Sequence, residues 1–154
     1  MGYLKNGEWH DEWAHNDEDS GEFERDESAF RSWITPDGSP GPTGKGGFPA
    51  EAGRYRLYIS LACPWAHRAN AVRHLKGLTD AIELNVVHWL MKDGGWSFRD
   101  GECVTGDPAI GAGNLHQLYS HAKPDYSGHV TVPVLWDTQT ETIVNNESAD
   151  IMRM

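Results

Sequence analysis

The sequence has few cysteines and no long apolar run, and both absences limit what the protein can be. Its 154 residues include only two cysteines, Cys63 and Cys103, too few for a disulfide framework or a four-ligand zinc site. No apolar run approaches the roughly 20 residues that a membrane-spanning helix needs, and the N-terminus lacks the apolar core of a signal peptide. We therefore expect a cytoplasmic protein that holds no metal and has no membrane partner.

Positive charge is also scarce. The chain carries 13 basic and 23 acidic side chains, which gives a formal net charge of -10. Surfaces that bind nucleic acid or anionic lipid need clustered Lys and Arg, so this balance argues against both as partners. Hydrophobic residues make up 38% of the sequence, too many for a disordered chain and consistent with one domain rich in loops.

Residues 1–50 differ in composition from the rest. They hold eleven of the 23 acidic and four of the 13 basic side chains. The stretch 35–47 is rich in proline and glycine, which disfavours both a helix and a central strand. We therefore divide the chain into an acidic, Gly/Pro-rich extended arm over 1–50 and a domain over 51–154. Lone aromatic residues suggest that parts of the arm dock, although a solvated acidic leader also fits its composition.

The pattern of residues 51–154 predicts alternating strands and helices. Strands are expected where β-forming or apolar residues cluster, and helices where apolar residues recur at three- or four-residue spacing. The expected strands are 54–60, 82–90, 130–136 and 140–144, and the expected helices are 63–76, 115–122 and a last one beginning near 146. The strand over 82–90 is mostly apolar, so we expect it to be buried on both faces. The order is an α/β pattern with a thioredoxin-like succession.

Cys63 occupies a position that favours thiol chemistry. It follows a strand and opens a helix, whose free N–H groups and dipole favour the thiolate, and Arg68 and Arg73 add positive charge on that helix. Three residues on stands Ala66 in place of a second cysteine, so any redox cycle uses an external thiol. A buried structural cysteine is the alternative. We expect Cys103, in a glycine-rich loop, to be structural.

Two further segments suggest a ligand site. Pro133 interrupts an apolar strand, and if its peptide bond with Val132 is cis, the Val132 backbone can pair with an extended ligand; an edge-strand proline is the alternative. At the last helix start, the Ser148 hydroxyl and backbone N–H groups suit a carboxylate, and Glu147 suits an ammonium. Helix capping explains these residues as well. A ligand with an amino-acid head and a distant thiol would span from this cap to Cys63, and glutathione fits that description.

Six short segments together resemble one known family. They are FRSWIT (30–35), FPAEAGRYRLYIS (48–60), ACPWAHR (62–68), GWSF (95–98), TVPVLWD (131–137) and NNES (145–148). With them, nearly the whole chain resembles the glutathionyl-hydroquinone reductases, the Xi class of glutathione transferases. The resemblance implies a thioredoxin fold and a catalytic Cys63 that attacks the sulfur of a glutathionyl-hydroquinone. A mixed disulfide with glutathione would form, and a second glutathione would release glutathione disulfide.

The resemblance also implies roles for further residues by position. Those implied to bind glutathione are Trp96, His129, Val132, Pro133, Glu147 and Ser148. Trp96 would pack on the tripeptide, Val132 would bind its backbone, and the last two would hold the γ-glutamyl head. His129 stands where the family commonly has a basic residue, so one charged contact departs from the family pattern.

The resemblance further concerns partners and a second domain. Members act on aromatic glutathionyl conjugates and carry a C-terminal all-helical domain, which lines the quinone pocket and makes the homodimer. That domain is absent from these 154 residues, so we expect the thioredoxin-like domain to be truncated at its last helix. Two alternatives stay open. They are a general monothiol transferase of the glutaredoxin type and a non-catalytic glutathione-binding module.

Overall fold

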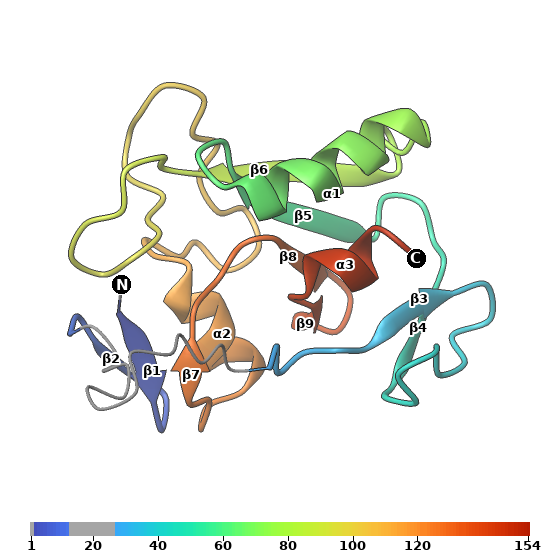
Figure 1. Ribbon diagram of the computed structural model, residues 1–154, viewed down its shortest axis with the longest axis horizontal. Helices are drawn as coiled ribbons and strands as arrows, with labels where there is room; N and C mark the ends of the chain where they lie inside the picture. The colour runs from blue at the N-terminus through green and yellow to red at the C-terminus, as the bar shows by residue number, and fades with distance from the viewer. Residues whose placement is uncertain (1, 13–26) are drawn as a thin grey trace, which may run out of the picture.

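A four-stranded sheet forms the centre of the computed structural model, which describes residues 2–12 and 27–154 (Figure 1). Its strands are β5 (Tyr55–Ser60), β6 (Ile82–Val87), β8 (Val134–Asp137) and β9 (Thr142–Asn145), in the order β6-β5-β8-β9. β5 and β6 are parallel, whereas β8 pairs antiparallel with both β5 and β9. This is the mixed sheet that the thioredoxin-like succession predicts.

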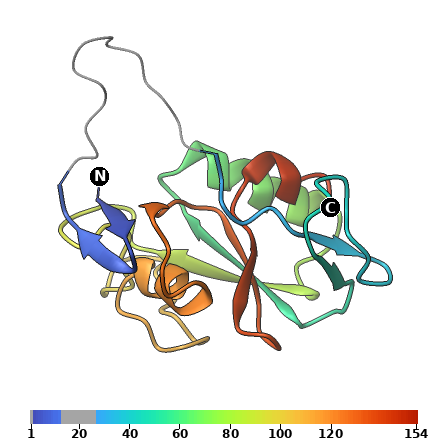
Figure 2. The ribbon, with the colours of Figure 1, turned by 90° about the horizontal axis from the view of Figure 1, so that it is seen from below.

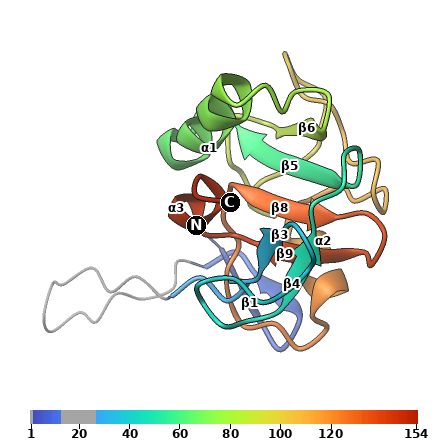
Figure 3. The same ribbon diagram turned by 90° about the vertical axis from the view of Figure 1, so that its right-hand side faces the viewer.

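Helices cover both faces of the sheet (Figure 3). α1 (Pro64–Leu75) and α3 (Ser148–Ile151) lie on one face, and α2 (His116–Ala122) lies on the other. A strand covered on both sides buries side chains of both orientations. Leu57, Tyr58 and Ile59 of β5 accordingly have at most 2% of their surface exposed.

Two predicted strands differ most from the observed ones. β6 ends at Val87 and forms an edge of the sheet, and Glu83 in its first half is exposed. The prediction that this strand is buried on both faces was therefore wrong for its first half. The segment predicted over 130–136 is a strand only from Val134, because Pro133 has no backbone N–H to donate to a ladder.

The predicted arm packs on the domain over much of its described length. β1 (Tyr3–Lys5) and β2 (Glu8–His10) form a hairpin that pairs with β7 (Gly128–His129), and β3 (Trp33–Thr35) pairs in parallel with β4 (Gly47–Pro49). The segment that leads into β3 runs beside α3 (Figure 2). Residues 1 and 13–26 of the arm lie outside the described residues, and the domain boundary at residue 50 stays a prediction.

The buried phenol of Tyr119 fixes two segments that are far apart in the sequence. Its hydroxyl donates to the Thr131 carbonyl at 2.8 Å and accepts from the Asn146 side-chain amide at 3.3 Å. Burial raises the pKa of Tyr119, so the hydroxyl remains a donor at neutral pH. Thr131 precedes Val132 and Asn146 precedes Glu147, so one side chain on α2 sets the relative position of both segments.

An ion pair joins the arm to α3. The Asp150 side chain is 1% exposed and accepts hydrogen bonds from Arg31 and from Arg153, the latter at 2.7 Å. Burial by itself would raise the pKa of Asp150, but these hydrogen bonds outweigh it and hold the pKa below its ordinary value. The ionised carboxylate therefore stabilises the packing of the arm on α3.

Removing the Tyr119 hydroxyl tests its role in the fold. We expect Tyr119→Phe to lower the free energy of unfolding in urea by about 1–3 kcal/mol, because it leaves buried partners unsatisfied. Tyr3→Phe is the control, since the Tyr3 ring stacks on His10 and phenylalanine keeps that contact. Its effect should stay within about 0.5 kcal/mol. Equal losses of unfolding free energy in the two variants would mean that the buried Tyr119 hydroxyl does not stabilise the fold.

The lowered pKa of Asp150 makes the stability of the chain depend on pH. A carboxyl whose pKa is depressed on folding stabilises the chain above its unfolded pKa and loses that contribution as the pH falls. We expect Asp150→Asn to be less stable than the wild type at pH 7 and the difference to shrink from about pH 5 downward. Urea unfolding at a series of pH values measures this. Asp125→Asn, at an exposed position, is the control, and parallel curves for Asp150→Asn and wild type would contradict the prediction.

Candidate functional site

Cys63 is the N-cap of α1, at the turn that follows β5, as the sequence predicts. Its backbone is extended (φ -102°, ψ 115°), and its carbonyl accepts the His67 N–H at 2.9 Å. Pro64 takes the first helical position, where a missing N–H costs no hydrogen bond. The first turn holds no acidic residue. The half-buried thiol thus lies at a helix N-terminus, without opposing charge from that turn.

The Cys63 thiol lies against the Val132–Pro133 peptide, which is cis. Its Sγ is 3.7 Å from the Val132 carbonyl oxygen, within reach of a weak S–H···O hydrogen bond. Val132 is 5% exposed and belongs to the main hydrophobic core. The structure thus brings together two elements of the predicted site that are 69 residues apart.

Glu147 and Ser148 lie at the start of α3, two residues after the expected helix start. Glu147 caps the helix, since its Oε1 accepts the Ala149 N–H at 3.1 Å and its Oε2 accepts from the Ser28 hydroxyl at 3.0 Å. Ser148 is buried, and its Oγ accepts from Arg68 Nη2 and Nε at 2.6 and 3.1 Å. The capping role left open by the sequence is therefore present. Arg68 also connects this end of α3 with α1.

Trp96 and His129 lie in separate segments. Trp96 is half-buried in the loop between β6 and α2, where it packs on the main core and its carbonyl accepts the Leu115 N–H at 2.8 Å. His129 belongs to β7, pairs with Tyr3, and accepts a hydrogen bond from the Tyr126 hydroxyl through its carbonyl. The structure thus links Cys63 directly with the cis peptide, whereas Trp96 and His129 lie in segments that contact the N-terminal hairpin region.

Hairpin residues that the sequence did not single out hold the loop of Trp96. Asp11 Oδ1 accepts the Gly94 N–H at 2.6 Å and the Trp9 indole N–H at 2.8 Å. Both hydrogen bonds lower the pKa of Asp11, and the one from Gly94 has the larger effect. The Trp9 ring also stacks on His116 at a centroid distance of 4.7 Å. Asp11 and Gly94 are 83 residues apart, and no local pattern could have paired them.

Arg73 and Cys103 lie away from the thiol. Arg73 is one of the two arginines expected to add positive charge to the helix. It lies near the C-terminal end of α1 and donates to the carbonyls of Ile82 and Thr79, which follow the helix. Burial lowers the pKa of Arg73. Cys103 is exposed in the loop before α2 and has a φ of 62°. Neither residue shares the environment of Cys63.

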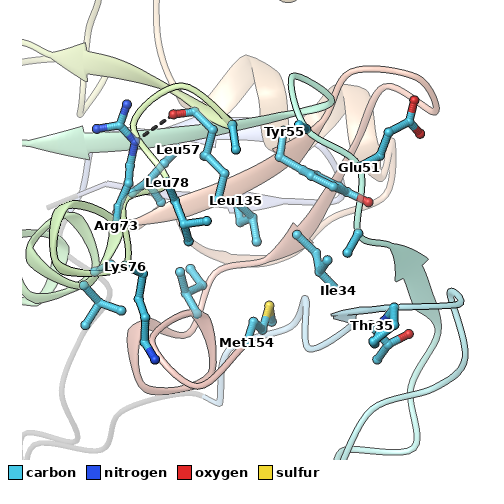
Figure 4. Close-up of a pocket in the computed structure, with 18 residues that line it drawn as sticks. Ile34, Thr35, Glu51, Tyr55, Leu57, Arg73, Lys76, Leu78, Leu135 and Met154 are labelled. Carbon is cyan, nitrogen blue, oxygen red and sulfur yellow. Dashed lines mark hydrogen bonds between the residues drawn. The ribbon is translucent and has the colours of Figure 1, made fainter.

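A cavity of about 520 Å³ lies at the opposite end of α1 from Cys63 (Figure 4). Its lining is mostly apolar and comes from α1, α3, β5, β8 and the segments around β3 and β4. Side chains that face it include Ile34, Tyr55, Leu57, Leu135 and Met154. The predicted glutathione-binding residues do not line this cavity, so it is separate from the thiol site.

Neither a metal-ligand group nor a membrane-spanning helix occurs in the described part of the chain. Among residues 2–12 and 27–154, no three His, Cys, Asp or Glu side chains are grouped so that they could hold a metal ion. Over the same ranges, no helix is both long and apolar enough to cross a membrane. The site offers a thiol, a carboxylate, a hydroxyl, a guanidinium and backbone groups.

The chain is similar to known proteins of one family. Residues 62–154 match the family model for the glutathione S-transferase N-terminal domain. The glutathionyl-hydroquinone reductase YqjG of Escherichia coli K12 is 56% identical over the whole chain, which covers 47% of that protein. The glutathionyl-hydroquinone reductase PcpF of Sphingobium chlorophenolicum is 42% identical, with 46% of that protein covered. The chain thus spans about half the length of the curated relatives it matches.

Solved structures agree with the sequence relatives. The glutathione-bound structure of YqjG matches 99% of this chain and 44% of that one, with a TM-score of 0.85 and 52% identity. A Xi class transferase from Natrialba magadii matches the whole chain and 44% of that one, with a TM-score of 0.82 and 45% identity. The resemblance to the Xi class and the thioredoxin-like fold are therefore confirmed. The chain belongs to the glutathione S-transferase family and carries the N-terminal domain of that family.

Proposed function

We propose that the chain is the thiol-bearing, glutathione-binding part of a glutathionyl-hydroquinone reductase, with Cys63 as its catalytic residue. The observation that carries the proposal is the Cys63 thiol at the N-terminus of α1, against the carbonyl of Val132. The names of the two reductases that match the whole chain support the same activity. Glutathione is the proposed cosubstrate, and aromatic glutathionyl conjugates are the proposed substrates.

In this proposal glutathione lies across the start of α1, the cis peptide before β8 and the start of α3. Its cysteinyl part pairs with the Val132 backbone beside Cys63, in the manner of an added strand. Its γ-glutamyl head reaches the start of α3, where Glu147 suits the ammonium and Ser148 the carboxylate. Trp96 packs on the tripeptide. Pro133 leaves the peptide edge without an N–H at that position, and His129, near the same edge, is proposed to contact the glycine end.

The chemistry follows from a single thiol. The Cys63 thiolate attacks the sulfur of the conjugate, a sulfur–sulfur bond forms, and the bond between that sulfur and the aromatic carbon breaks. The aromatic carbon keeps the electron pair and takes a proton, so the hydroquinone is released and the two sulfurs are oxidised to a mixed disulfide. A second glutathione thiolate attacks this disulfide, releases glutathione disulfide and returns the Cys63 thiolate. Ala66 offers no thiol, so the second thiol comes from outside the chain.

Location and assembly belong to the same proposal. A cycle that consumes glutathione and needs a reduced Cys63 suits the cytoplasm, where the glutathione pool keeps thiols reduced. The homodimer and most of the quinone pocket are expected in the C-terminal helical domain that the resemblance assigns to full-length members. Activity on hydroquinone conjugates is therefore proposed for the longer protein, and reaction of Cys63 with small disulfides is proposed for these 154 residues.

Replacing Cys63 by Ser tests the catalytic assignment. A hydroxyl cannot form the disulfide intermediate, so Cys63→Ser should abolish both the adduct formed with glutathione disulfide and the reductase turnover. Cys103→Ser is the control and should leave both unchanged. Mass spectrometry locates the adduct, and parallel assays on a glutathionyl-hydroquinone and a simple mixed disulfide measure turnover. An adduct on Cys103 alone would reverse the assignment, and turnover of the mixed disulfide only would favour the general thiol transferase.

Trimming Trp96 tests where the tripeptide lies. We expect Trp96→Ala to weaken glutathione binding by about 1–2 kcal/mol, because an aromatic packing contact with the ligand is lost. Titration calorimetry on the reduced chain measures the affinity. Trp89→Ala, which trims a half-exposed indole beyond the end of β6, is the control and should bind as the wild type does. Unchanged affinity in Trp96→Ala would place the tripeptide elsewhere.

A further inference from the structure

We propose that Arg68 recognises the α-carboxylate of the γ-glutamyl head of glutathione. This inference rests on the proposed function and adds a ligand-binding residue that the sequence motifs do not assign. Arg68 follows Cys63 by five residues, about one and a half turns along α1. The sequence suggests that it supports the thiolate, but the structure directs its side chain toward α3.

The guanidinium of Arg68 reaches from α1 to the start of α3. Its Nη2 and Nε donate to Ser148 Oγ at 2.6 and 3.1 Å. The same Nη2 lies 3.8 Å from Glu147 Oε1. A cation, an anion and a hydroxyl are thus gathered where the amino-acid head of the ligand is proposed to lie.

The Trp65 ring restricts the orientation of this guanidinium. Arg68 Cζ lies 4.8 Å from the centroid of the ring, a geometry in which a cation is attracted to the aromatic face. The Arg68 side chain is 36% exposed, so a ligand can reach it. A guanidinium has five N–H donors, and the hydrogen bonds to Ser148 use two of them. A bound carboxylate can accept from the others without displacing that contact.

The electrostatics of the site require a cation for the carboxylate. α3 has only four residues, so the dipole of this helix contributes little, and the nearby Glu147 carboxylate repels a second carboxylate. Arg68 offsets that repulsion. With the ligand ammonium on Glu147 and the ligand carboxylate on Arg68, each charge of the zwitterionic head meets an opposite charge. The ligand also covers the exposed part of Arg68, and excluding water strengthens the contact.

A glutathione analogue that lacks only the α-carboxylate isolates this contact. In 4-aminobutyryl-cysteinyl-glycine the ammonium, the thiol and the glycine carboxylate are all retained. We expect the wild-type chain to bind glutathione about 10- to 100-fold more tightly than this analogue, the range for a charge-assisted hydrogen bond. Arg68→Gln should lose most of that preference, since its glutathione affinity falls by about the same factor while its affinity for the analogue changes less than about 3-fold.

Two further variants serve as controls in the same calorimetric titrations. Arg68→Lys keeps the charge and should retain part of the preference, although it lacks the planar fork of the guanidinium. Lys76→Gln removes one positive charge at the C-cap of the same helix and should keep the full preference. The rate at which Cys63 reacts with an uncharged small disulfide should match the wild type in Lys76→Gln, and the retained affinity of Arg68→Gln for the analogue shows that the rest of the site is intact in that variant.

The outcomes separate this inference from the proposed function. Full retention of the preference in Arg68→Gln would overturn this inference but not the proposed function, because another group would then bind the carboxylate. Equal losses for both ligands would also overturn it, because they would assign Arg68 to the packing of α1 on α3. A wild-type chain that binds neither ligand would overturn the proposed function, and the inference with it.

Discussion

The contact between the Cys63 thiol and the Val132 carbonyl is the constraint on which the rest of the site depends. It follows from the register of the central sheet, where β5 and β8 pair antiparallel with Tyr58 opposite Val134. Continuing that register brings the end of β5 level with residue 132, so the turn that carries Cys63 emerges beside the cis peptide. β5 is buried between the helices on its two faces, so a change of its register would require the core to repack on both sides of the sheet.

The remainder of the site is held at the ends of elements rather than within them. Tyr119 sets the positions of Thr131 and Asn146, which directly precede the cis peptide and the cap of α3. Arg68 then links that cap to α1 through Ser148. The buried core thus supplies rigidity, while the residues of the proposed site lie at the ends of segments.

Local pattern predicted much of this arrangement. Alternation and three-residue spacing gave β5 and α1 nearly to the residue, and they placed Cys63 at the helix start. The edge position of β6 was not predictable from its apolar composition. The order of strands in a sheet depends on how they pair with one another, and the composition of one strand does not determine that pairing. The polar contacts of Ser28, Asp11 and Arg68 join residues 119, 83 and 80 positions apart. Contacts between residues so far apart produce no periodic pattern in the sequence. Some of these residues nevertheless lie in the motifs that resemble the family.

The overall acidity of the chain is compatible with a site for a ligand that carries carboxylates. A net charge of -10 argues against polyanions, because such partners contact many charges over a long surface. Charges farther away than about 8 Å are largely screened at physiological ionic strength, so a small ligand responds mainly to its immediate neighbours. At the start of α3 these neighbours include one guanidinium and one carboxylate within 3.8 Å of each other. A zwitterionic amino-acid head matches that pair, whereas a simple anion matches only half of it, so the local charge pattern agrees with the position proposed for the γ-glutamyl head.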